Sequence, residues 1–189
     1  EQRNAYMGET RNQIKELSDL FVSLGASKEV IGFSNSRLAY DEIISKFCYA
    51  IEKQTLKKKI TSTDLSEQYR KGNPFSDKCI KIAEETIRKF FMCITKYGDH
   101  QFSFNKATLF SWLVFVRQNL SMNQVELTQV VFNFEFCRDY VKGKKRNDAL
   151  LNINEYVRLQ KVLPFFEVML NTFNQRASMG STDALSIIY

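Results

Sequence analysis

The chain has 189 residues, of which 44% are apolar and 13% aromatic, and its 27 Lys and Arg against 21 Asp and Glu give a net charge of +6. This apolar content is enough for one substantial core and argues against disorder. Seven Gly and two Pro are too few for the turns of an all-β fold, and the longest apolar run, residues 112–116, is much shorter than the roughly 20 residues of a membrane span. We therefore expect an all-α, cytoplasmic protein without a membrane partner.

Apolar residues at helical spacing predict four helices in the first half of the chain. The first covers residues 3–24, because Ile14, Leu17 and Phe21 share one stripe and Gly25 is a good helix stop. A linker follows at 25–35. The other three helices are expected at 36–53, from a cap within 60–65 to about Gly72, and at 76–97.

The second half predicts three more helices. Asn105 is expected to cap a helix whose centre is apolar nearly all round, which is typical of a central helix. Ser121 and Gln124 fit a capping box for the next helix, which runs through the apolar positions Val130, Phe134, Cys137 and Val141. Asn154 can cap the last full helix, which Pro164 should kink or break. The expected architecture is an irregular bundle of about seven helices.

Signatures of catalysis or metal binding are missing from the sequence. The cysteines Cys48, Cys79, Cys93 and Cys137 are widely spaced and the only histidine is His100, so buried reduced thiols and no metal site are expected. Phosphate-binding glycine loops and hydrolase elbows are absent. The neighbouring carboxylates Asp41–Glu42 and Glu84–Glu85 diverge by about 100° on a helix, so solvated surface explains them best.

Two basic clusters are the candidate nucleic-acid contacts. Clustered cations neutralise backbone phosphates and release counterions, which gives affinity without sequence readout. Solubilising turns between helices explain the same residues without any function. The clusters consist of Lys53, Lys57, Lys58 and Lys59, and of Lys142, Lys144, Lys145 and Arg146.

Several short stretches together resemble the region that follows the ParB-like domain in the GmrSD-type family. The first two are residues 1–8 (EQRNAYMG), with an E-x-R-N-A block, and 37–44 (RLAYDEII). Later landmarks are 65–70 (LSEQYR), 105–110 (NKATLF) and 173–178 (FNQRAS). The resemblance covers essentially the whole chain, and the order and spacing of the stretches carry most of it.

The resemblance implies an accessory helical domain of a bacterial DNA-restriction, anti-phage defence protein. Members of that family have a ParB/sulfiredoxin-like domain with a D-G-Q-Q-R motif, implicated in nucleoside triphosphate hydrolysis, and often an HNH nuclease. Neither motif occurs here, so no catalytic residue and no cofactor are expected in this segment. A nucleoside triphosphate and a divalent metal would belong to the parent protein, an NTP-dependent DNA endonuclease.

The residue pattern and this resemblance together predict how the chain is organised. Residues 1–189 would be one helical domain of a longer protein, in which 1–24 connect to the upstream domain, 36–176 form the helical core and 181–189 start a truncated helix. The partners would be the ParB-like domain of the same protein and DNA, with homo-oligomerisation left open. A non-catalytic protein–protein interaction module is the alternative function.

Two further pairs of residues have both functional and structural interpretations. By the resemblance, Arg3 and Asn4 lie closest to the nucleotide, where Arg could hold phosphate in a bidentate fork. The alternative is that they only anchor the first helix to the upstream domain. Arg37 and Asp41 lie four residues apart, so an ion pair within one helix would explain them.

Overall fold

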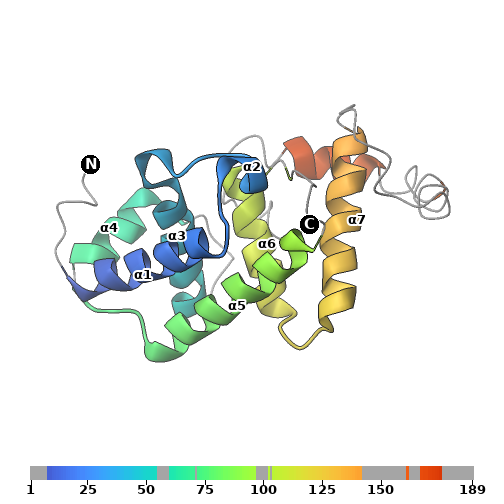
Figure 1. Cartoon of the computed structure of the whole chain (residues 1–189). Helices are drawn as coiled ribbons and strands as arrows, with labels where there is room; N and C mark the ends of the chain where they lie inside the picture. The colour runs from blue at the N-terminus through green and yellow to red at the C-terminus, as the bar shows by residue number, and fades with distance from the viewer. Residues whose placement is uncertain are drawn as a thin grey trace.

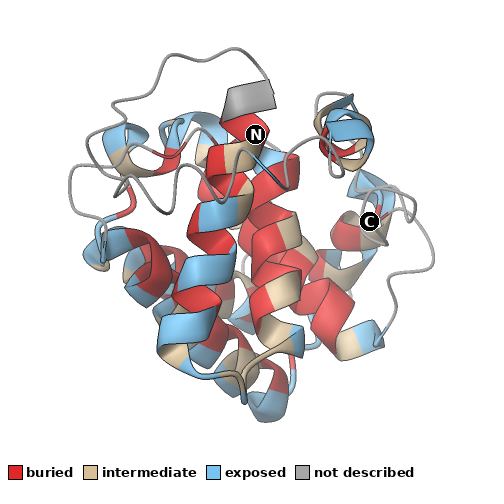
Figure 2. Ribbon diagram, turned by 90° about the vertical axis from the view of Figure 1, so that its right-hand side faces the viewer, coloured by how far each residue is buried: buried red, intermediate tan, exposed pale blue. Residues whose placement is uncertain are grey.

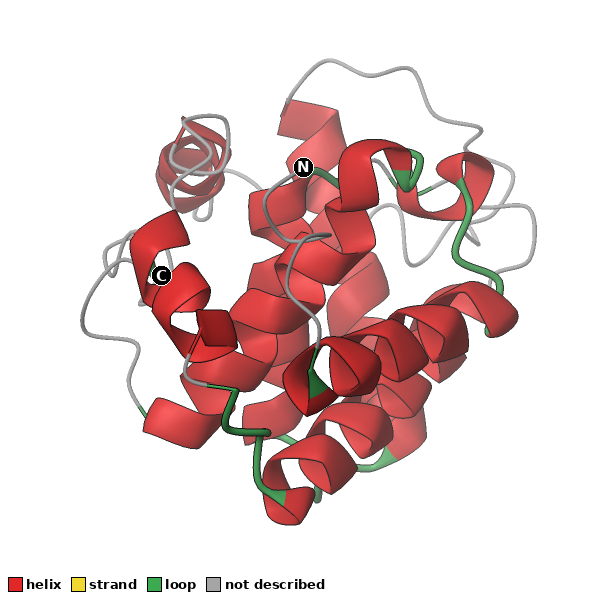
Figure 3. Ribbon diagram, turned by 90° about the vertical axis from the view of Figure 1, so that its left-hand side faces the viewer, coloured by secondary structure: helices red, strands yellow, loops and turns green. Residues whose placement is uncertain are grey.

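The computed structural model describes residues 8–54, 60–70, 72–96, 102, 104–141, 161 and 167–175, and all regular structure in these ranges is helical (Figures 1 and 3). The predicted all-α fold is therefore confirmed. A further helical segment covers residues 167–175. The elements are α1 (Glu9–Ser23), α2 (Lys28–Ile31), the 3₁₀ turn η2 (Ser36–Leu38), α3 (Ala39–Lys53), α4 (Ser62–Arg70), α5 (Asp77–Thr95), α6 (Lys106–Gln118) and α7 (Gln124–Val141).

Polar side chains begin three of these helices where the sequence predicted a start. Asn105 Oδ1 accepts from the Thr108 N–H at 2.9 Å and opens α6, and Ser76 Oγ accepts from the Cys79 N–H at 3.2 Å and opens α5. Thr61 and Asp64 cap each other's backbone N–H at the start of α4, at 3.2 and 2.8 Å. Each contact satisfies an N–H that has no partner inside its helix.

Helix α6 is the centre of the core, as its apolar sequence predicted. Its buried side chains point to several sides of the helix axis, and α3 and α5 both pack against it. The buried faces of the surrounding helices turn inward (Figure 2). The buried residues of α6 are Ala107, Thr108, Leu109, Phe110, Trp112, Leu113, Val114 and Val116.

Helix α1 belongs to the same core. The ring of Phe21 lies between Tyr40 of α3 and Phe91 of α5, with centroids 5.1 and 4.8 Å away. Gln13 adds a reciprocal pair of hydrogen bonds to the backbone of Phe75, both at 2.9 Å. These contacts tie α1 to α3 and to the segment that leads into α5.

The expected linker at 25–35 is wrong in one respect, because it contains the short helix α2. Ser27 caps it and Ile31 within it is fully buried. Gly32 ends α2 at φ +99°, and a Cβ there would lie 3.1 Å from backbone atoms of Phe102 and Phe104. A four-residue helix is too short to show an apolar repeat in the sequence. Such a short helix is stable only through its tertiary contacts.

The expected helix at 36–53 is also corrected at its beginning. Arg37 and Leu38 have left-handed backbone conformations, with φ of 54° and 57°, so the α-helix starts only at Ala39. The Asn35 side chain reaches past this turn and accepts from the Tyr40 N–H at 2.8 Å. Arg37 is exposed and forms no ion pair with Asp41, because the helical spacing that the ion pair requires is broken between them.

Helix α7 exists as predicted, but its cap differs, and the apolar positions named in the sequence are not its most deeply buried ones. It begins at Gln124, and its cap is Asn123, whose Oδ1 accepts from the Val125 N–H at 2.8 Å, rather than Ser121. Val130 is exposed, and Phe134 and Cys137 are only half-buried. The residues that face the core are Leu127, Thr128, Val131, Phe132, Glu135, Phe136, Arg138 and Asp139.

The last predicted helix lies largely outside the described residues, which include neither Asn154 nor Pro164. Within 167–175, Leu170 and Phe173 are buried, and the ring of Phe173 lies 5.1 Å from that of Phe134 on α7. This segment therefore packs on the side of α7 that carries Phe134. None of the helices within the described ranges has the length and apolar character needed to cross a membrane.

Candidate functional site

Most of the residues that the sequence singled out for function lie outside the described ranges. These are the nucleotide-proximal candidates Arg3 and Asn4, the cations Lys57, Lys58 and Lys59, the cations Lys142, Lys144, Lys145 and Arg146, and His100. They stay predictions. Lys53 is described, and it is exposed at the end of α3 with its Nζ 5.8 Å from the centroid of the Tyr49 ring.

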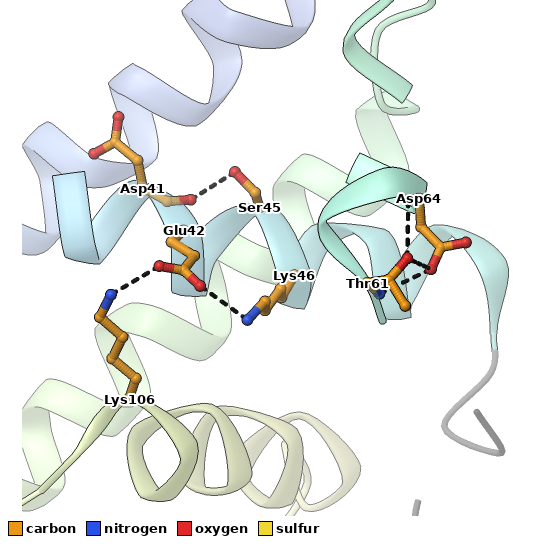
Figure 4. A network of polar contacts seen from close by, with 7 residues as sticks. All are labelled: Asp41, Glu42, Ser45, Lys46, Thr61, Asp64 and Lys106. Carbon is orange, nitrogen blue, oxygen red and sulfur yellow. Dashed lines mark hydrogen bonds and ion pairs between the residues drawn. The ribbon is translucent and has the colours of Figure 1, made fainter. Parts of the chain in front are cut away.

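The sequence suggested that the carboxylates Asp41 and Glu42 are solvated. In the structure each of them has protein partners instead. Ser18 of α1 donates to Asp41 Oδ1 at 2.9 Å. Glu42 forms ion pairs with Lys46 on the same helix at 3.0 Å and with Lys106 of α6 at 2.7 Å (Figure 4). The two neighbouring carboxylates diverge as expected, and each meets a different helix.

The environment of Glu42 changes its acidity. Burial raises the pKa of this carboxyl, but hydrogen bonds and charges from Lys106 and Lys46 outweigh burial and lower the pKa to about 2. Glu42 is therefore charged throughout the physiological range. It joins α3 to α6 at the edge of the core, which is a structural role.

The neighbouring carboxylates Glu84 and Glu85 lie on a solvated helix surface, as the sequence analysis expected. Glu84 forms an ion pair with Arg88, one turn further along α5, at 2.8 Å, and both side chains are about half exposed. Such a pair on a helix surface contributes about 0.3–0.5 kcal/mol. It marks a solvated face of α5 rather than a site.

The strongest concentration of buried charge lies between α6 and α7, in a set of residues that sequence reasoning missed. We call Thr108, Trp112, Glu135 and Arg138 the α7 polar cluster. Trp112 Nε1 donates to Glu135 Oε1 at 2.6 Å, Arg138 Nη2 lies 2.6 Å from Glu135 Oε2, and Arg138 Nη1 donates to Thr108 Oγ1 at 2.9 Å. The side chains of Glu135 and Arg138 are 0% and 1% exposed.

Ions as deeply buried as these are expensive to remove from water and persist only when paired and hydrogen-bonded. Within the cluster, Glu135 accepts a hydrogen bond from the indole of Trp112 and pairs with the guanidinium of Arg138, so it is both hydrogen-bonded and paired. Asp139, the next residue along α7, is buried as well. The arrangement holds charge in place inside a helical core; the described contacts do not place a nucleophile next to a base.

One sequence signal could have found this cluster. Leu127, Val131, Glu135 and Arg138 recur at intervals of three and four residues, so the charges continue an apolar stripe along α7. The neighbouring stripe, with Val130, Phe134 and Cys137, is entirely apolar and therefore gave the stronger prediction. The more deeply buried face also carries Phe132 and Phe136, so apolar residues occur on both sides of α7 and do not reveal the buried charges.

The cysteines are free thiols, as predicted, with Cys48, Cys79 and Cys93 buried and Cys137 half-buried. A side-chain hydrogen bond with Cys79, together with burial, raises the pKa of Cys48, and burial raises the pKa of Cys93 and Cys137. A raised pKa keeps a thiol protonated and unreactive at neutral pH. Within the described ranges, no three His, Cys, Asp or Glu side chains gather closely enough to hold a metal ion.

Comparison of the chain with protein-family models, curated proteins and solved structures finds no match. The geometry must therefore be interpreted from the residues themselves. Two sets stand out: the α7 polar cluster in the core and the Glu42 ion pairs at its edge. The α7 polar cluster joins two consecutive helices, α6 and α7, and the Glu42 ion pairs join α3 to α6.

Proposed function

We propose that this chain is the accessory helical domain of a GmrSD-like DNA-restriction protein in bacterial anti-phage defence. In this role it supports a nucleotide-dependent ParB-like domain and contacts the DNA backbone through its two basic clusters. Catalysis, the nucleoside triphosphate and any divalent metal belong to the parent protein. The resemblance of the sequence stretches to that family is the basis of the proposal.

The observation that supports the proposed role is that two of these stretches touch in the folded domain and a third contacts the residue next to one of them. Glu42, in the 37–44 stretch, forms a 2.7 Å ion pair with Lys106, in the 105–110 stretch. Ser45, one residue beyond the 37–44 stretch, shares a buried 2.7 Å hydrogen bond with Tyr69 in the 65–70 stretch. Residues that touch in this way build a scaffold, and a scaffold suits a domain that positions another.

The coding sequence upstream of Glu1 tests the family. A nucleotide-binding domain of ordinary size needs on the order of 200 codons. A D-G-Q-Q-R motif within a ParB-like sequence there is the expected finding. A start codon close to Glu1, or an unrelated upstream domain, would contradict the proposal and leave the non-catalytic interaction module as the better function.

Salt-dependent DNA binding tests the backbone contact. Fluorescence anisotropy with a labelled duplex should give affinities that fall steeply with added salt. Replacing Lys142, Lys144, Lys145 and Arg146 by Gln should make that dependence shallower by roughly 0.9 in log–log slope for each phosphate that the protein no longer neutralises. The matched control replaces four exposed lysines elsewhere, Lys15, Lys28, Lys78 and Lys81. Equal effects of both sets would reduce the binding to general charge and refute the specific contact.

A further inference from the structure

Two buried thiols meet where α3 packs against α5. Cys48 of α3 and Cys79 of α5 are 0% and 1% exposed, and they lie 31 residues apart in the sequence. Cys79 Sγ donates to the carbonyl oxygen of Cys48 at 3.3 Å. A hydrogen bond between the two side chains is also the main reason that the pKa of Cys48 is raised. The fold therefore places the two sulfur atoms next to each other.

The other two cysteines have different surroundings. Cys93 Sγ accepts from Gln124 Nε2 of α7 at 3.2 Å, and Cys137 is half-buried on α7. A disulfide needs Cα atoms within about 7 Å of each other and Cβ atoms that point toward each other. The contact across α3 and α5 makes Cys48 and Cys79 the pair that meets these requirements with the least movement.

The start of α5 connects this pair to the surface. Cys79 is the third residue of α5, and its N–H donates to Ser76 Oγ at 3.2 Å. Ser76 donates from its Oγ and its N–H to the Glu52 carboxylate of α3, at 2.8 and 3.3 Å. We call these contacts the Glu52–Ser76 cap. They are exposed to solvent, and exposed hydrogen bonds at a helix end open more readily than a packed core.

The closed pair is inert, because buried thiols with a raised pKa stay protonated. Opening of the cap would release Cys79 to a peroxide. An S–O bond then forms on Cys79, the O–O bond breaks, and water leaves with the thiol proton. The Cys48 sulfur attacks the Cys79 sulfur, an S–S bond forms, and the S–O bond breaks to release a second water. The two thiols thus lose two hydrogens and two electrons, and peroxide is reduced to water.

We infer that Cys48 and Cys79 are a peroxide-sensitive thiol pair, which the Glu52–Ser76 cap guards in the reduced protein and which oxidation converts into a disulfide between α3 and α5. The disulfide holds the start of α5 against α3 whether or not the exposed cap is closed. Oxidation therefore suppresses opening at this end of α5, and a thiol reductant restores it.

Oxidation of the whole chain by hydrogen peroxide tests the pairing. The remaining thiols are blocked with N-ethylmaleimide during denaturation, and peptides are mapped by mass spectrometry without reduction. The expected product joins the peptides of Cys48 and Cys79, is about 2 Da lighter than their sum, and is separated by dithiothreitol. Cys79→Ser should abolish this product, whereas Cys93→Ser should leave it unchanged.

The half-buried Cys137 shows when the peroxide dose is sufficient. If Cys137 is oxidised while Cys48 and Cys79 are still recovered as blocked thiols, the inference is wrong. A disulfide that joins Cys93 or Cys137 to either member of the pair would also overturn it, because the contact between α3 and α5 would then not select the partners.

Two matched cap variants test the guarding role. Ser76→Ala removes the cap beside Cys79, so the disulfide should form about fivefold faster than in the natural chain. Asn105→Ala removes a cap of the same kind from α6, and it should change the rate by less than about twofold, because that helix end is not next to the pair. Equal acceleration by both variants would show that oxidation follows general loosening, and it would reject the guarding role of the Glu52–Ser76 cap.

Discussion

The indole N–H of Trp112 donates a 2.6 Å hydrogen bond to the carboxylate of Glu135 across the interface of α6 and α7, where both side chains are buried. The same carboxylate faces the guanidinium of Arg138 at 2.6 Å. A short set of directional contacts thus joins the central helix α6 to α7. Its contribution to stability can be measured against that of an exposed ion pair.

Arg138→Met should lower the free energy of unfolding by about 3–5 kcal/mol, because it removes the guanidinium that lies 2.6 Å from the buried Glu135 carboxylate. Arg88→Met is the matched control, since Arg88 pairs with Glu84 in solvent, and it should change the free energy by less than about 0.5 kcal/mol. Urea unfolding followed by circular dichroism measures both. Similar losses for the two variants would show that burial does not distinguish the pairs.

Glu42 should contribute stability that depends on pH. Its folded-state pKa, about 2, lies below its ordinary value of 4.5, so the contribution is fully present above about pH 4.5 and disappears as the pH falls toward 2. After allowance for solvent screening it should amount to about 1 kcal/mol. The advantage of the natural chain over Glu42→Gln should therefore shrink between pH 5 and pH 2.5 in urea unfolding. An advantage independent of pH would contradict the assignment.

Gly32 should tolerate substitution less well than Gly25. Both have positive φ, +99° and +105°, but only at Gly32 would a Cβ meet other atoms, at 3.1 Å from backbone of Phe102 and Phe104. Gly25→Ala should cost about 1 kcal/mol for its backbone conformation, and Gly32→Ala at least about 1 kcal/mol more for the steric conflict. Thermal unfolding of the two variants compares them directly; equal midpoints would indicate that the close approach relaxes freely.

Asn123 should be the residue that caps α7. Its Oδ1 accepts from the Val125 N–H at 2.8 Å, so Asn123→Ala should destabilise the protein by about 1 kcal/mol. Ser121→Ala should have almost no effect, because α7 begins three residues later at Gln124. Chemical unfolding of both variants checks this. A larger loss for Ser121→Ala would restore the capping box that the sequence suggested.

Much of the helical framework could be predicted from local chemistry. Asn105 and Ser76 begin helices because a side-chain acceptor beside free N–H groups needs no tertiary partner. The central position of α6 followed from its apolar sequence, since only an element surrounded by others can bury most of its circumference. The free cysteines followed from their spacing.

The errors occur where specific side-chain contacts outweigh the repeating apolar pattern. The left-handed turn at Arg37 and Leu38 is bridged by the Asn35 side chain, which a repeating apolar pattern does not reveal. The two acidic neighbours Asp41 and Glu42 were interpreted as solvated because adjacent residues diverge on a helix. They do diverge, but α1 and α6 lie where they point, with Ser18 and Lys106 as partners.

By itself, the sequence determined that this protein is helical, where most helices begin and which helix is central, because these properties depend on residues within one or two turns of each other. Only the tertiary structure decided which face of α7 is buried. Glu135 and Arg138 can enter the core only where Trp112 and Thr108, more than 20 residues away in the sequence, meet them at hydrogen-bonding distance. A buried charge depends on its partners in space, and an apolar pattern along one helix contains no information about them.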